Sequence, residues 1–346
     1  GIDLILLNNR LNFSGDIYRR DTRDMLTTGK VLPSVLGTGI PPENSADLKT
    51  TGFELTVSWR DKFDLAGKPL QYSIDFNLSD SRSKIIKFSN PTGTLTTFYE
   101  GMKIGEVWGL KVKGLYTTDE EAKNGPDQTE ILMNPSLYPT TAGTLNYEDL
   151  NKDGRITRGS YTLNDHGDLT VIGNTEPRYR FGTTLGASWN GIDLSLFFQG
   201  VMKRNYAPDG SDHVFFGKYA QAWNVETVGH YQDRWREDNM DSNAYWPILT
   251  HASADRRILN REMMIPNDRY LQNAAYVRLK NLTFGYTFPK EWLSKAGIQR
   301  LRIFYSGDNL FCVSGLYKYY SVDPENLGAH KYPFQRFNSF GLNVTF

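Results

Sequence analysis

The sequence has little cysteine, no charge imbalance and no long apolar run. Only one of the 346 residues, Cys312, is a cysteine, which excludes an internal disulfide framework and a cysteine-rich metal site. The 39 basic side chains balance 39 acidic ones, so nucleic acid is not an expected partner, because phosphate binding requires a basic surface. The apolar run Leu4 to Leu7 is far shorter than the roughly 18–20 apolar residues of a membrane-spanning helix.

The sequence also lacks targeting and catalytic motifs. No basic segment followed by an apolar one has the form of a signal peptide, so we expect the chain to be a mature protein, a cytosolic protein or a fragment. The metalloprotease motif H-E-x-x-H, the nucleophile elbow G-x-S-x-G and the P-loop are all missing. We therefore predict no catalytic residues and no enzymatic activity.

Aromatic residues and glycine are abundant. The chain contains 20 Tyr, 19 Phe, 7 Trp and 31 Gly, yet only 39 % of its residues are hydrophobic and its mean hydropathy is −0.50. A polar chain rich in aromatics and glycine is typical of an outer-membrane β-barrel, in which every second strand residue faces lipid and long loops face water.

Hydrophobic side chains alternate with polar ones in several segments of about 9–12 residues, the length a tilted strand needs to cross a bilayer. In the last segment, Phe340, Leu342, Val344 and Phe346 share one face. Asn190-Gly191 predicts a two-residue hairpin turn. The alternation slips near Lys280-Asn281, which predicts a β-bulge.

The predicted strands are joined by connections that are alternately short and long. The short ones are at 8–9, 61–69, 190–191 and 289–299, and the long ones at 21–51, 81–177, 204–275 and 312–334. Short periplasmic turns and long extracellular loops are typical of outer-membrane barrels. We therefore predict an all-β fold, an antiparallel transmembrane β-barrel with about nine strands over 1–346. The segment Ile104–Gly114 is assigned to a loop, and 81–177 and 204–275 are expected to be long extracellular loops.

The number of predicted strands also indicates whether the barrel is complete in this chain. If Phe346 ends in the periplasm, nine strands place the start of the first strand on the extracellular side. We therefore expect an N-terminal portion of the barrel to be missing.

Several ordered motifs resemble one family. They are Asn8-Asn9-Arg10-Leu11, Asp47-Leu48-Lys49-Thr50-Thr51-Gly52-Phe53-Glu54, Asp149-Leu150-Asn151-Lys152-Asp153-Gly154-Arg155-Ile156, Val171-Ile172-Gly173-Asn174-Thr175-Glu176-Pro177-Arg178-Tyr179, Tyr276-Val277-Arg278-Leu279-Lys280-Asn281-Leu282-Thr283-Phe284-Gly285-Tyr286, Ser306-Gly307-Asp308-Asn309-Leu310-Phe311 and Gly341-Leu342-Asn343-Val344-Thr345-Phe346. Together they resemble the C-terminal barrel portion of SusC/RagA-like TonB-dependent transporters of Bacteroidetes outer membranes.

The resemblance implies a 22-stranded barrel closed by an N-terminal plug. It implies a SusD-like surface lipoprotein as partner, TonB contacted through the missing N-terminal region, and outer-membrane lipid around the barrel. The imported nutrient would be an oligosaccharide or a peptide. The plug and the first strands are absent from this chain.

One loop has the ligand spacing of a calcium-binding turn. Asp149, Asn151, Asp153 and Arg155 occupy alternate positions around Gly154, where side-chain and backbone oxygens can surround a hard cation. The twelfth position of a standard calcium-binding loop is a glutamate that closes the site, but here it is Ser160. Asp165 or Asp168 could supply the closing carboxylate. A Ca²⁺ or Mg²⁺ ion that braces the 149–168 loop is one prediction, and a metal-free Asx-rich turn is the alternative.

The long loops carry many aromatic residues that could contact a ligand or a partner. These candidates are Tyr206, Phe215, Phe216, Tyr219, Trp223, Trp235, Tyr245 and Trp246. Flat rings stack on sugar faces, and aromatics are enriched at the cores of interfaces. Packing of the loop against itself is the alternative.

The polar faces of the strands would line a wet lumen, either as a polar passage for a hydrophilic solute or only as a hydrated surface in contact with the plug. Their residues include Glu54, Asp75, Asn77, Arg180, Asp193 and Gln199. A soluble extracellular carbohydrate-binding β-sandwich is the first alternative for the whole chain, because it would share the aromatics, the Asp-rich loop and the alternation. A surface glycoside hydrolase is a second alternative, without positive residue evidence.

Overall fold

The computed structural model describes residues 1–28, 37, 41–132, 139–210, 212–220, 224–249, 261–328 and 331–346. Nine strands form one antiparallel sheet in the order β1-β2-β3-β4-β9-β10-β13-β14-β15. Their bounds are β1 Ile2–Leu6, β2 Leu11–Thr28, β3 Pro42–Leu65, β4 Lys68–Lys87, β9 Arg178–Trp189, β10 Ile192–Lys203, β13 Tyr276–Thr287, β14 Arg300–Ser314 and β15 Phe337–Thr345. Each strand pairs with the strand next to it in this order, and all of these pairings are antiparallel. The predicted set of about nine antiparallel strands is therefore confirmed.

The registers place the alternating side chains on two different faces. One row of directly opposed residues crosses five adjacent strands, and its members are, in order, Leu11, Trp59, Ile74, Leu185 and Leu196. Directly opposed residues of antiparallel strands share a face, so these side chains form one continuous apolar row. Polar residues form the opposite face. A sheet of this kind suits a wall between lipid and water.

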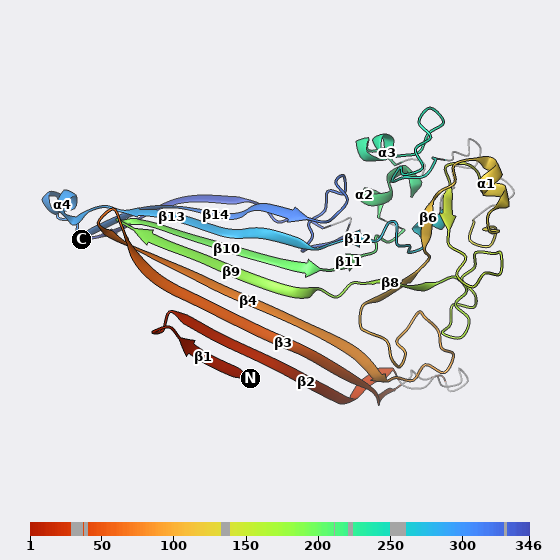
Figure 1. Cartoon of the computed structure of the whole chain (residues 1–346), viewed down its shortest axis with the longest axis horizontal. Helices are drawn as coiled ribbons and strands as arrows, with labels where there is room; N and C mark the ends of the chain where they lie inside the picture. Colours follow the sequence, from red (N-terminus) through yellow and green to blue (C-terminus); the bar gives the residue numbers. More distant parts are fainter. Residues whose placement is uncertain are drawn as a thin grey trace.

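The connections follow the predicted alternation (Figure 1). The turns β1–β2, β3–β4, β9–β10 and β13–β14 lie at one end of the sheet, where the last also carries α4 (Lys290–Leu293). Asn190 (φ 48°) and Gly191 (φ 89°) form the expected tight turn between β9 and β10. The long connections, with the short helices α1 (Asp119–Asn124), α2 (His213–Phe216) and α3 (Val228–Gln232), lie at the other end.

Three strands are longer than predicted. The expected loop 21–51 is largely strand, because β2 runs to Thr28 and β3 starts at Pro42, and β4 continues past 81 to Lys87. Backbone hydrogen bonds continue there although the apolar alternation has ended. A hydrophobic pattern reports only the part of a strand with an apolar side, so it missed these extensions.

Two detailed predictions are confirmed. The pairing of β13 skips Lys280 against both neighbours, which is the bulge expected near Lys280-Asn281. Within Ile104–Gly114, β5 (Glu106–Gly109) pairs only with β8 (Thr170–Asn174), and β6 (Val112–Leu115) pairs with β7 (Leu145–Tyr147). Apart from Ile104, whose N–H donates to Ser83 O of β4, this segment is outside the main sheet, as predicted.

The long connections fold together into what we call the loop module, defined as the described residues of 88–177, 204–275 and 315–328. Buried side chains from all three segments form one cluster, including Leu110, Leu145, Phe215, Trp246 and Tyr320. The two-residue strands β11 (Asn205–Tyr206) and β12 (Gln272–Asn273) join the start and end of the middle segment. The module therefore has its own hydrophobic core beyond the end of the sheet.

Among the described residues, no helix combines the length and the apolar content needed to cross a membrane.

Candidate functional site

The polar face of the sheet brings several predicted lumen residues together. Glu54 opposes Ser79, which opposes Arg180 on the next strand. On β9, Gly182 lies directly opposite Asn77 of β4 and directly opposite Gln199 of β10. A hollow of about 440 Å³ lies at this level and is lined by Asn77, Arg180, Gln199, Arg204, Tyr276 and Glu325, among others.

Other lumen candidates are compensated by ion pairs nearer the short turns. Asp75 accepts a hydrogen bond from Arg60 at 2.9 Å, and Asp193 accepts one from Nε of Arg302 at 2.9 Å. The first pair joins the neighbouring strands β3 and β4, and the second reaches across β13 from β14 to β10, so both carboxylates are neutralised.

A buried ion cluster attaches the β14–β15 connection to the wall. Arg278 of β13 is only 3 % exposed and contacts Asp323 at 2.6 Å and Glu325 at 2.7 Å. Lys280, at the bulge, also contacts Glu325 at 3.2 Å, and the ring of Phe334 lies beneath its ammonium group at 4.4 Å. Burial by itself would raise the pKa of Asp323, but the hydrogen bonds from Arg278 and from the backbone N–H of Glu325 outweigh it and lower that pKa. The cluster was missed in the sequence because its members are 45 residues apart.

Most of the predicted loop aromatics are buried against one another. Trp246 is completely buried, and Phe215, Phe216, Tyr219 and Trp235 are each at most 3 % exposed. The Trp246 ring stacks on Tyr219, with centroids 5.4 Å apart. Tyr206 and Tyr245 are partly buried against the same cluster. Trp223 lies outside the described residues. These rings form the core of the loop module. This arrangement matches the alternative in which the loop packs against itself.

Four members of this core were not among the sequence candidates: Tyr270, Tyr317, Tyr320 and His230. The Tyr317 hydroxyl donates to Asp233 at 2.7 Å and accepts from the Trp246 indole at 3.2 Å. The Tyr320 hydroxyl donates to Asp212. Burial raises the pKa of Tyr245 to about 12, so its hydroxyl stays protonated, and it accepts a hydrogen bond from Gln272 at 2.9 Å. The tyrosine-rich segment 317–320 was a signal in the sequence for Tyr317 and Tyr320, but not for Tyr270 or His230.

The predicted calcium-like loop forms a dense turn. Asp149 accepts hydrogen bonds from the backbone N–H of Lys152 and Gly154 at 2.6 and 2.8 Å. Asp168 accepts from Leu150 N and Thr157 N, both at 2.8 Å. Of the remaining predicted ligands, Asn151, Asp153 and Arg155 hydrogen-bond within the turn, and Asp165 accepts from Ser160. Over the described ranges, no three His, Cys, Asp or Glu side chains converge as metal ligands. The cation stays a prediction.

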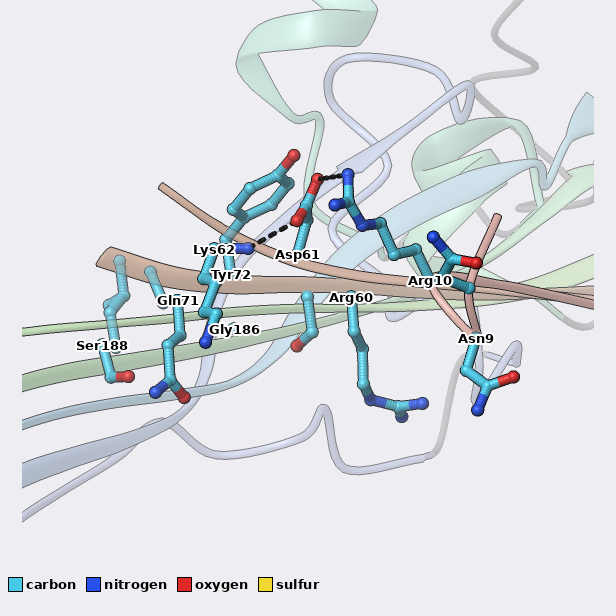
Figure 2. A pocket seen from close by; sticks show the side chains of 13 residues that line it. Asn9, Arg10, Arg60, Asp61, Lys62, Gln71, Tyr72, Gly186 and Ser188 are labelled. Carbon is cyan, nitrogen blue, oxygen red and sulfur yellow. Dashed lines mark hydrogen bonds and ion pairs between the residues drawn. The ribbon is translucent and has the colours of Figure 1, made fainter. Parts of the chain in front are cut away.

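A second hollow lies at the short-turn end (Figure 2). Its volume is about 740 Å³, and Arg10 donates to Asp61 there at 3.2 Å, beside Lys62 and Tyr72. Figure 2 shows that Asp61 and Tyr72 point to one side of the strands and Arg60 and Gln71 to the other. The hollow therefore follows the ends of the hairpins and does not converge on one ligand.

Comparisons with known proteins agree with this architecture. No protein-family model matches the chain. All of the chain matches the TonB-dependent receptor P3 of Formosa agariphila at 28 % identity, and the TonB-dependent receptor SusC of Bacteroides thetaiotaomicron at 22 %. A solved structure of the RagAB peptide transporter covers 98 % of the chain with a TM-score of 0.66 and 22 % identity.

The matches define a class, the TonB-dependent receptors. The chain is similar to SusC and to the RagAB chain among them, which confirms the SusC/RagA resemblance seen in its motifs. The chain spans about a third of the length of these relatives, 33 % of receptor P3 and 34 % of the RagAB chain.

The relatives are receptors and transporters, which agrees with the prediction that the chain is not an enzyme. The β-sandwich alternative is not favoured, because the described strands form one nine-stranded sheet and otherwise only two-stranded ones.

Proposed function

We propose that this chain forms part of the barrel wall and of the outer loops of a TonB-dependent importer in the bacterial outer membrane. The observation that carries the proposal is the two-faced sheet with its long connections gathered at one end. The polar face would line the passage of an oligosaccharide or peptide nutrient. The apolar face would contact outer-membrane lipid.

Import by this route would require three further components. A plug and a TonB-contacting segment, expected in the part of the protein that precedes this chain, would supply the gate and its link to inner-membrane energy. A SusD-like lipoprotein would cover the loop module from the extracellular side. The partnerships with TonB and with the lipoprotein are supported by the likeness to SusC and to the RagAB chains.

The surface of the loop module offers a docking area for the lipoprotein. Val225, Val228 and Tyr231 are 79, 63 and 53 % exposed and lie at or beside α3, which projects from the module (Figure 1). The guanidinium groups of Arg234 and Arg236 lie 5.5 and 4.6 Å from the Tyr231 ring. Exposed apolar side chains next to tyrosine and arginine have the composition of an interface core.

Uptake by cells tests the proposal. Cells that express the full-length protein should take up labelled oligosaccharides or peptides, and uptake should stop when TonB or the lipoprotein is deleted. Gln199→Trp fills the wall hollow and should lower uptake. Phe340→Trp, on the opposite face, is the matched control. Uptake that continues without TonB contradicts the proposal.

A further inference from the structure

A cationic hollow opens where β4 and β9 separate. Their last paired residues are Ser79 and Arg180. Beyond this point segment 101–104 occupies the free edge of β4, with Ile104 N donating to Ser83 O at 3.0 Å. The Asn174 amide closes the other side by donating to Ile104 O at 2.8 Å. The enclosed hollow has a volume of about 210 Å³.

The side chains that line this hollow carry an excess of positive charge. They are Arg82, Lys103, Arg178 and Lys203, with Glu176 as the one acidic member. Asp80 forms an ion pair with Arg178, and it also interacts electrostatically with Arg82. Within the part of the chain that the structure describes, no ion pair involves the other three cations. Ser81, Ser83 and Asn174 add neutral hydrogen-bonding groups.

The register places two of these cations opposite each other. Lys203 is directly opposite Arg178 across the β9–β10 ladder. Like charges in directly opposed positions destabilise a sheet. Asp80 is already engaged with Arg178, so Lys203 is left without an acidic partner. Lys203 therefore contributes an uncompensated positive charge at the rim of a partly enclosed hollow, where it would attract an incoming negative group.

The positive surface continues into the hollow of about 440 Å³ on the polar wall. Arg180 and Arg204 line that hollow, and Nε of Arg204 donates to Thr175 O at 3.1 Å, next to Glu176. Its one acidic lining residue, Glu325, is already paired with Arg278 and Lys280. The two hollows thus form adjacent compartments with unpaired cations in both.

We infer that the hollow between β4 and β9 is a subsite for a carboxylate or sulfate group of the imported oligomer. The inference rests on the proposed function, since it assumes that the polar wall lines the passage. At about 210 Å³ the hollow is smaller than a typical small-molecule site, so it would hold one charged unit while the neighbouring hollow receives the rest. Lys103 and Lys203 bind the anion, and the serine hydroxyls orient it.

Binding by the full-length protein, purified in detergent, tests the subsite. The probes are tetragalacturonate and tetraglutamate, with maltotetraose and tetraalanine as their neutral counterparts, measured by titration calorimetry. Lys103→Gln/Lys203→Gln should weaken binding of an anionic probe about tenfold, the size expected for loss of charge-assisted hydrogen bonds. The control, Lys113→Gln/Lys123→Gln, removes two exposed lysines of the loop module and should change binding less than about twofold. Lys103→Arg/Lys203→Arg should retain the affinity.

The outcomes separate the subsite from the proposed function. A preference for tetragalacturonate or for tetraglutamate identifies the anion as belonging to a sugar or a peptide, and either supports the subsite. Neutral probes that bind as tightly as anionic ones, or an unchanged double variant, overturn it. If only the neutral probes are taken up in a TonB-dependent way, the proposed import function is supported and the subsite is refuted. Tight, lysine-dependent binding of an anionic probe without any uptake supports the subsite and contradicts import.

Discussion

The replacement Trp246→Ala tests whether the loop aromatics form a core or a ligand surface. Trp246 is completely buried, stacks on Tyr219 and Tyr270 at 5.4 and 5.1 Å, and donates to the Tyr317 hydroxyl. Truncation of a buried tryptophan to alanine costs about 3–5 kcal/mol. The loop module should lose this amount from its local free energy of unfolding, because the ring lies at the centre of its cluster.

Hydrogen exchange measured by mass spectrometry on the full-length protein is the assay. With about 1.4 kcal/mol per tenfold change, the loss corresponds to about two to three and a half orders of magnitude faster exchange. The faster exchange should be confined to the module, including the amide of Trp235, which donates to Trp246 O at 2.9 Å. Strands β9 and β10 should exchange at their original rate.

Trp292→Ala is the matched control. This tryptophan is 68 % exposed and lies at the short-turn end, so its removal should leave exchange in the module unchanged. Unchanged exchange in Trp246→Ala, together with lost binding of an oligosaccharide or peptide, would refute the packing argument and assign the ring to a ligand.

Four further outcomes are expected. Arg278→Ala leaves Asp323 and Glu325 buried without their main partner, so it should cost about 3–5 kcal/mol and expose segment 315–336 to proteolysis; intact protease resistance would contradict this. Tyr231→Asp should abolish co-purification with the lipoprotein while heat-modifiable migration of the barrel on gels persists. Gly191→Ala places a methyl group 2.6 Å from a backbone oxygen and should impair assembly, whereas Gly67→Ala, also at positive φ but with open space around it, should impair assembly much less; equal effects would refute the steric argument. Burial lowers the pKa of His230, so its stabilising contribution is present above about pH 6.5, the unfolded value, and declines as pH falls from there toward the folded pKa; His230→Gln should flatten this pH dependence of exchange in the loop module.

Local patterns determined much of the fold. Period-two alternation is a property of consecutive residues, so the apolar rows, the tight Asn190-Gly191 turn and the bulge at Lys280 could all be predicted from the sequence. The lengths of the connections depend only on where the strands lie, and for that reason the gathering of long loops at one end was also predictable. The ordered motifs pointed to the SusC/RagA-like class.

Features that depend on distant partners were decided by the tertiary structure. A tryptophan such as Trp246 suits a ligand surface and a core equally well, and only the packing of the loop module shows which it joins. Strand ends without an apolar side carry no hydrophobic signal, so β2 and β3 extended unpredicted. The Arg278 cluster and the opposition of Lys203 to Arg178 arise from register and loop closure between residues far apart in the chain, because charges acquire partners only once the strands are in place.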